Sequence, residues 1–166
     1  MSYKFIFPKK DAWIAESSAS VNFGGDQILE LKKEYDSLNP ETFVGVTRIL
    51  SYFDLTSISS SIVSGEIPAA ETGSKGESSV KYFLKLYSTE ASELPTEYTL
   101  IANPLSQSFE EGSGFRDDVP VVSDGVSWTY TDTRNTSSKW LVLNEGTSTS
   151  GSRTVSGGGN WYTGSG

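Results

Sequence analysis

Short runs in which apolar and polar residues alternate recur along the chain. The clearest are residues 46–55 (VTRILSYFDL) and residues 80–87 (VKYFLKLY), in which similar side chains fall on every second position. A period of two sends successive side chains to opposite faces of an extended strand, so both runs predict β-strands. Shorter aromatic or β-branched runs predict further strands at residues 4–7, 11–15, 98–102, 126–130 and 140–143.

Two segments fit more than one kind of structure. Residues 27–33 (QILELKK) suit a strand or a helical turn, and the preceding Gly24-Gly25 favours the strand. Residues 57–79 begin with spaced apolar side chains, which suit a short helical turn or an irregular crossover, and continue into a loop. Roughly seven strands with long loops and no alternation with helices are typical of an all-β fold. We therefore predict an antiparallel β-sandwich, jelly-roll-like in its connections.

The apolar faces of the strongest strands, with the aromatic residues beside them, are expected to build the core. Burial of such faces is the main favourable contribution to folding. The residues that we assign to the core are Ile49, Phe53, Tyr82, Leu84 and Trp128.

The C-terminal end differs in composition from the rest. Of the 23 residues in 144–166, 16 are Gly, Ser or Thr, a content that cannot build a core by itself. We therefore divide the chain into a β-sandwich domain at 1–143 and a Gly/Ser/Thr-rich segment at 144–166. This segment is expected to be ordered only where another part of the chain or a partner holds it. Its aromatic residues Trp161 and Tyr162 are the candidates for contact with a partner protein or a glycan.

The charge of the chain narrows the range of partners. The formal net charge is -8, with the acidic residues dispersed along the sequence. Nucleic acids and anionic membrane surfaces attract basic proteins, so we expect neither as a partner. No apolar run approaches the roughly 20 residues of a membrane-spanning helix, and we expect no signal peptide in the N-terminal residues.

Composition also restricts catalysis. The sequence contains no His and no Cys, which excludes Ser-His-Asp and Cys-His nucleophilic systems and zinc or iron sites built on those ligands. Glycoside hydrolysis by two carboxylates is compatible with this composition. The neighbouring pairs Glu110-Glu111 and Asp117-Asp118 are no dyads by themselves, because adjacent side chains of an extended chain point to opposite faces. We predict that the protein is not an enzyme.

One loop could hold a metal ion. Asp117, Asp118 and Asp124 lie in a stretch with three glycines, and hard oxygen ligands on such a loop can bind calcium. Their spacing matches no EF-hand, and Asp and Gly are also the residues that turns require. We therefore expect no cofactor or metal site, with calcium as the one alternative.

Four segments taken in order resemble a known family. They are residues 11–14 (DAWI), 22–31 (NFG followed by QILEL), 48–55 (RILSYFDL) and 111–128 (EGSG followed by GVSW). This series is similar to the DNRLRE-type domain, a β-sandwich resembling carbohydrate-binding modules that occurs in extracellular bacterial and archaeal proteins. The resemblance is closest to versions in virion proteins of tailed phages and covers about residues 3–140. It brings no catalytic residues to transfer.

The resemblance implies a function in assembly. The chain is expected to be a virion structural protein, a decoration, fibre or tail-associated component on the exterior of a phage particle. It would bind other virion proteins and form a homo-oligomer or multicopy assembly. The alternative is a carbohydrate-binding module or adhesin domain that recognises a cell-surface glycan. The family often has Trp at the position of Phe109 and usually continues beyond Gly166, so we expect further C-terminal strands to be missing here.

Overall fold

A computed structural model of the chain describes residues 4–39, 41–67, 82–89, 98–140 and 157–161. The chain forms two compact units, which we treat separately. The first, here called the helical unit, comprises Met1–Lys9 and Phe53–Tyr98, and the second, the sheet unit, comprises Lys10–Tyr52 and Thr99–Gly166.

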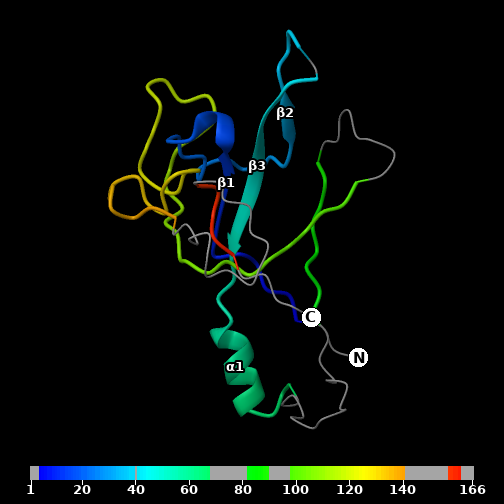
Figure 1. Cartoon of the computed structure of the whole chain (residues 1–166). Helices are drawn as coiled ribbons and strands as arrows, with labels where there is room; N and C mark the ends of the chain where they lie inside the picture. Colours follow the sequence, from blue (N-terminus) through cyan, green and yellow to red (C-terminus); the bar gives the residue numbers. More distant parts are fainter. Residues whose placement is uncertain (1–3, 40, 68–81, 90–97, 141–156, 162–166) are drawn as a thin grey trace, which may run out of the picture. The chain divides into compact units, whose positions relative to one another are not determined.

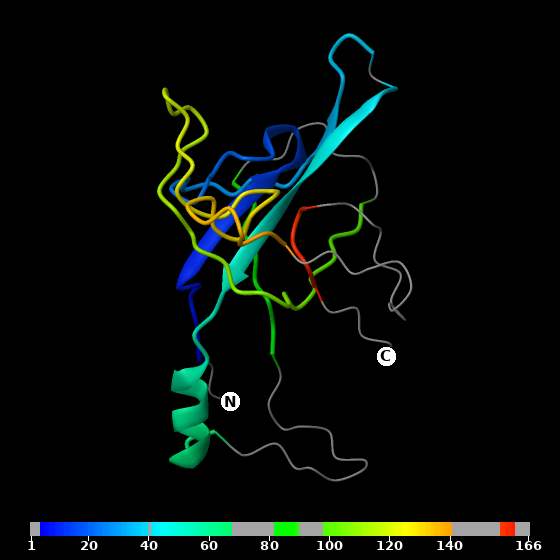
Figure 2. The ribbon, with the colours of Figure 1, turned by 60° about the vertical axis from the view of Figure 1, so that its left-hand side comes forward.

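The sheet unit is built on a three-stranded antiparallel sheet with the strand order β1-β3-β2 (Figure 1). Its strands are β1 (Lys10–Ala15), β2 (Lys33–Tyr35) and β3 (Phe43–Tyr52), and a short 3-10 helix, η1 (Glu16–Ser18), follows β1. The two longer strands, β1 and β3, lie side by side in both views (Figure 2) and pair from Lys10 opposite Tyr52 to Ala15 opposite Thr47. The short β2 pairs with the first half of β3.

Both faces of the β1–β3 pair are packed. The first core cluster takes Ala12, Ile14 and Leu50 from one face, and the second takes Trp13 and Ala15 from the other. The register explains this division, because Ala12 stands opposite Leu50 while its neighbour Trp13 stands opposite Ile49. Four side chains from beyond the sheet complete the first cluster; they are Phe109, Val126, Trp128 and Trp140. The second cluster adds Phe23, which stacks on Trp13 with ring centroids 4.0 Å apart.

The stretch that supplies those four side chains is a hydrogen-bonded loop. The amide of Val126 donates to the carbonyl of Glu110 over 2.6 Å, and the amide of Thr131 donates to that of Ser138 over 2.7 Å. Tyr130 and Lys139 form only an isolated bridge. The strand predicted at 126–130 is therefore wrong, although its backbone groups find partners. Of the strand predicted at 140–143, Trp140 lies in no strand and the rest falls outside the described residues.

The helical unit contains α1 (Thr56–Val63), which confirms the helical alternative for the start of residues 57–79. The carboxylate of Asp54 accepts hydrogen bonds from the amide and hydroxyl of Thr56, which satisfies an amide at the helix start. From the N-terminal segment, the Nζ of Lys4 donates to the Ser61 hydroxyl over 2.7 Å. Within the described part of the chain, no helix is both long and apolar enough to span a membrane.

The regular structure is predominantly β, as the sequence indicates, and the strands predicted at 11–15 and 46–55 are confirmed as β1 and β3 with shifted ends. Of the strand predicted at 27–33, only Lys33 lies in a strand, as the first residue of β2. Residues 4–7 and 98–102 form no strand. Among the described residues, a second sheet packed on the first is not seen.

The core assignments divide in the same way. Trp128 is confirmed, with 3% of its surface exposed, and Ile49 and Phe53 are half-buried. Tyr82 and Leu84 are wrong, because their side chains are 70% and 56% exposed. Residues 82–87 belong to no strand, so the apolar face that their alternation creates has no neighbouring strand to pack with among the described residues.

Candidate functional site

The most distinctive contact in the sheet unit is a stack of one arginine between two tryptophans. Arg48 lies on β3 opposite Ile14, on the face of the first core cluster. Its guanidinium carbon is 4.7 Å from the ring centroid of Trp128 and 4.4 Å from that of Trp161. We call Arg48, Trp128 and Trp161 the arginine–tryptophan stack. Because cations are attracted to indole faces, the stack joins the C-terminal Gly157–Trp161 segment to the sheet.

Three glycines let that segment approach the stack. Gly157, Gly158 and Gly159 all have positive φ, which favours glycine at each position. A Cβ on Gly158 would collide with a guanidinium nitrogen of Arg48, the same Nη1 that donates a hydrogen bond to the Gly158 carbonyl. The amide and hydroxyl of Ser106 both donate to the Asn160 carbonyl over 2.8 Å. The body of the sheet unit thus supplies the contacts that hold these five residues, drawn in red in Figure 1.

The charge of Arg48 sits in a partly desolvated place. Burial lowers the pKa of its guanidinium, and the nearby Glu16 carboxylate acts in the opposite direction. An arginine stays protonated at any ordinary pH, so the stack holds a permanent cation. Of the two predicted contact residues, Trp161 packs on the guanidinium of Arg48 and has part of its surface exposed. Tyr162 falls outside the described residues.

Replacing Arg48 with methionine is expected to lower the free energy of unfolding by about 1–3 kcal/mol, because two cation–π contacts and a hydrogen bond are lost. Amide hydrogen exchange at Ser106, which bonds Asn160, should become faster as the segment loosens. The matched control is Arg134→Met, which removes an exposed guanidinium paired with Asp132 and should leave both measurements unchanged. Equal effects of the two substitutions would contradict the stack's role.

A buried asparagine ties three segments together in the same unit. The side chain of Asn22 is fully buried. Its Nδ2 donates to the carbonyls of Glu111 and Val126 over 2.7 and 2.8 Å. Its Oδ1 accepts from the amides of Gly24 and Gly114 over 3.2 and 2.9 Å. One side chain thus satisfies four backbone groups from three places in the sequence, and we call this set the Asn22 node.

The glycines around the node are required by space. A Cβ on Gly24 would overlap the carbonyl of Glu111, and a Cβ on Gly112 would overlap the Asn22 amide. Gly112 also has a φ of 80°, whereas Gly24 does not have positive φ. Gly112 and Gly114 both lie against Asn22. The node is a structural device with no reactive group.

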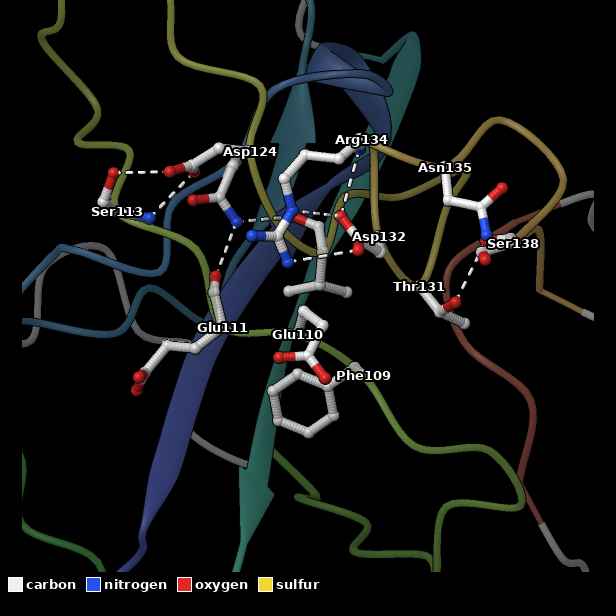
Figure 3. A network of polar contacts seen from close by, with 12 residues as sticks. Phe109, Glu110, Glu111, Ser113, Asp124, Thr131, Asp132, Arg134, Asn135 and Ser138 are labelled. Carbon is white, nitrogen blue, oxygen red and sulfur yellow. Dashed lines mark hydrogen bonds and ion pairs between the residues drawn. The ribbon is translucent and has the colours of Figure 1, made fainter.

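The carboxylates of the neighbouring loop are engaged in local contacts (Figure 3). Asp124 accepts from the amide and hydroxyl of Ser113 over 2.8 and 2.6 Å, and Asp132 pairs with Arg134 at 2.9 Å. Of the adjacent pair, Glu110 pairs with a lysine whereas Glu111 accepts from a backbone amide, so they serve different partners.

The loop carboxylates also bear on the calcium alternative. The predicted ligand Asp118 accepts from the amide of Phe115 over 2.8 Å, as a turn residue does. In the described ranges no three acidic side chains gather into a group that could hold a metal ion. The expectation of no metal site and its calcium alternative both stay predictions.

The Asp124 contact makes a pH-dependent contribution to stability. Hydrogen bonds from Ser113 hold the pKa of the Asp124 carboxyl below its ordinary value of 3.8. A carboxyl whose pKa is lowered by folding stabilises the native state above its unfolded pKa and loses that contribution as the pH falls through the folded value. Asp124→Asn should therefore be less stable than the unaltered chain at pH 7, and the difference should shrink below about pH 4.

Chemical denaturation of both chains between about pH 2 and pH 7 measures this difference. Ser113→Ala removes the hydroxyl donor alone and should reproduce part of the effect. A difference between Asp124→Asn and the unaltered chain that stays constant over this pH range would contradict the assignment.

The sequence did not single out the two residues on which these contacts centre. The sequence placed Arg48 only in a predicted strand and a family motif, and Asn22 only in a family motif. One signal was present for Arg48, since it is the charged residue within the apolar run 46–53. The comparisons with known proteins supply no further guide: a scan against family models, a search of the curated proteins and a search of the solved structures returned no match.

Proposed function

We propose that the chain is a structural component of a tailed-phage virion, with a β-sandwich fold of the DNRLRE type. It acts on the exterior of the particle as a decoration, fibre or tail-associated part by binding other virion proteins. The quoted motifs support this proposal through their structural roles. Asn22 and Gly24 meet Glu111 and Gly114 in the Asn22 node, so two motifs far apart in the sequence depend on each other.

The observation that carries the proposal is the number of large apolar side chains that face solvent in the isolated chain. In the sheet unit they include Tyr35, Leu38, Phe43, Ile101 and Val119. In the helical unit they include Phe5, Phe7, Val63, Phe83 and Tyr87. Large apolar side chains that contact solvent provide surface that other subunits can cover.

The acidic side chains fit a binding role better than a catalytic one. The sequence has no His and no Cys, which leaves carboxylates as the main acid–base groups. The described carboxylates Glu110, Glu111, Asp124 and Asp132 each contact a lysine, an arginine, a hydroxyl or a backbone amide. A glycosidase needs two carboxyl groups facing a common space, and this arrangement gives no support for one.

Mass spectrometry of purified particles tests the proposal, with the phage whose genome encodes the chain. We expect peptides of the chain among the peptides of the virion proteins. Antibodies raised against the chain should label intact particles, because an exterior component is accessible. Absence of the chain from the particles, or labelling only after they are disrupted, would overturn the proposal.

Trp161 supports glycan recognition as a second candidate function. Its indole is partly exposed while Arg48 supports it from one side, and a fixed aromatic ring can stack on a sugar. A glycan array probed with the full chain, and with Trp161→Ala beside it, separates the two functions. Binding to a defined glycan that is lost in Trp161→Ala would establish the second function. No binding to any glycan would leave protein–protein assembly as the sole proposal.

A further inference from the structure

The helical unit presents an extended apolar segment with no strand beside it among the described residues. This segment, Tyr82–Tyr87, is here called the open segment. Its five apolar side chains are 56–83% exposed. The Nζ of Lys85 lies 4.8 Å from the ring centroid of Tyr87, as expected where side chains two positions apart share one face of an extended backbone. Figure 1 draws the segment in bright green as an extended run.

The composition of the open segment is that of a strand. Tyr82, Leu84 and Leu86 alternate with Phe83 and Lys85, and aromatic residues such as Tyr and Phe fit a pleated surface. A strand of this type that stays unpaired is a template for another strand. Pairing would cover both its backbone groups and its apolar side chains.

We propose that the occupant is the open segment of a second copy of this chain, paired antiparallel about a two-fold axis at Leu84. In this register Leu84 faces its own equivalent, Tyr82 faces Leu86 and Phe83 faces Lys85 of the second copy. Every pair joins two apolar side chains or places a cation against an aromatic ring. Such cross-strand pairs stabilise a sheet.

The self-complementarity selects this register over its neighbours. A two-fold axis normal to the sheet keeps each side chain on its own face, so the axis must pass through a residue. An axis at Lys85 would set that lysine against its own equivalent. An axis at Phe83 would set Lys85 against Lys81 of the second copy. Like charges directly opposite each other destabilise a pair, so the axis at Leu84 alone avoids lysine facing lysine among the three central registers.

This inference deepens the proposed function by naming one surface through which copies meet, and its test needs no particle. The chain has no Cys, so Leu84→Cys introduces a single thiol. Residues directly opposite in an antiparallel pair have Cα atoms about 4.5–5.5 Å apart, within the range of a disulfide. Under mild oxidation the full-length variant should become a disulfide-linked dimer almost completely.

The control is Val63→Cys, whose position on α1 in the same unit is 88% exposed. This variant should cross-link far more slowly, because no symmetric contact holds its thiols together. Equal cross-linking of the two variants would overturn the inference. So would sedimentation of the unaltered chain as a monomer.

Introducing a charge at the axis gives an independent measurement. Leu84→Glu and Leu84→Lys should each be monomeric at concentrations where the unaltered chain is dimeric, and an equimolar mixture should form the mixed dimer. An unaltered chain that dimerises without cross-linking through Leu84→Cys would place the contact elsewhere, overturning this inference while leaving the proposed function standing. Stable association of the open segment with a different virion protein in place of a second copy would also overturn it.

Discussion

Asn22→Leu is expected to lower the free energy of unfolding by about 4 kcal/mol or more. The side chain is fully buried and pairs with four backbone groups, the carbonyls of Glu111 and Val126 and the amides of Gly24 and Gly114. Leucine has a similar volume but leaves all four without a partner, and each buried unpaired group costs about 1–3 kcal/mol. Since domains are stable by only about 5–15 kcal/mol, this variant should be close to unfolding at 37 °C.

Urea denaturation of the two chains measures the effect. The matched control is Asn135→Leu, because that side chain is exposed and its Oδ1 accepts a single local bond from the Ser137 amide. The control should cost less than about 1 kcal/mol. A comparable loss at both asparagines would show that the Asn22 node does not join the three segments as described.

Trp128→Ala is expected to cost about 3–5 kcal/mol, the usual range for deleting a buried aromatic side chain. The ring is a member of the first core cluster and also forms one side of the arginine–tryptophan stack. Its loss should therefore weaken both the packing on β1 and β3 and the attachment of Gly157–Trp161. Denaturation gives the first quantity, and amide exchange at Ser106 reports the second.

Trp161→Ala should be measured beside Trp128→Ala. Trp161 forms the other side of the stack but is partly exposed, so its removal should loosen the C-terminal segment with a smaller loss of global stability. If Trp161→Ala proved as destabilising as Trp128→Ala, the core would extend further into the C-terminal segment than the structure indicates.

Local patterns correctly predicted the two longer strands of the sheet and one aromatic residue of the core. The alternation at 46–55 and the short run at 11–15 became β3 and β1, and the buried aromatic at Trp128 was found in the core. The same kind of pattern was wrong for Tyr82 and Leu84. An alternating run specifies which side chains share a face but not which strand will cover that face.

The contacts that define the candidate site had no local signature. Asn22 reaches groups 89 and 104 residues away, and Arg48 reaches Gly158 at a separation of 110 residues. Such contacts depend on the folded path of the whole sheet unit. The glycines beside them are typical of turns in a sequence, yet Gly24 is required because its Cβ would collide with a carbonyl. Only the structure distinguishes that reason from a turn.

The measurement that most directly tests assembly into a virion is hydroxyl-radical footprinting of the chain in purified phage particles and in the free state. The reporters are exposed aromatic side chains outside the open segment; they are Phe5, Phe7, Tyr35, Phe43 and Phe115. We predict that one or more of these reporters lose reactivity in the particle, whereas buried Trp13 and Trp128 stay unreactive in both states. Identical reactivity of every reporter in the particle and in the free chain would contradict the claim that other virion proteins cover this surface.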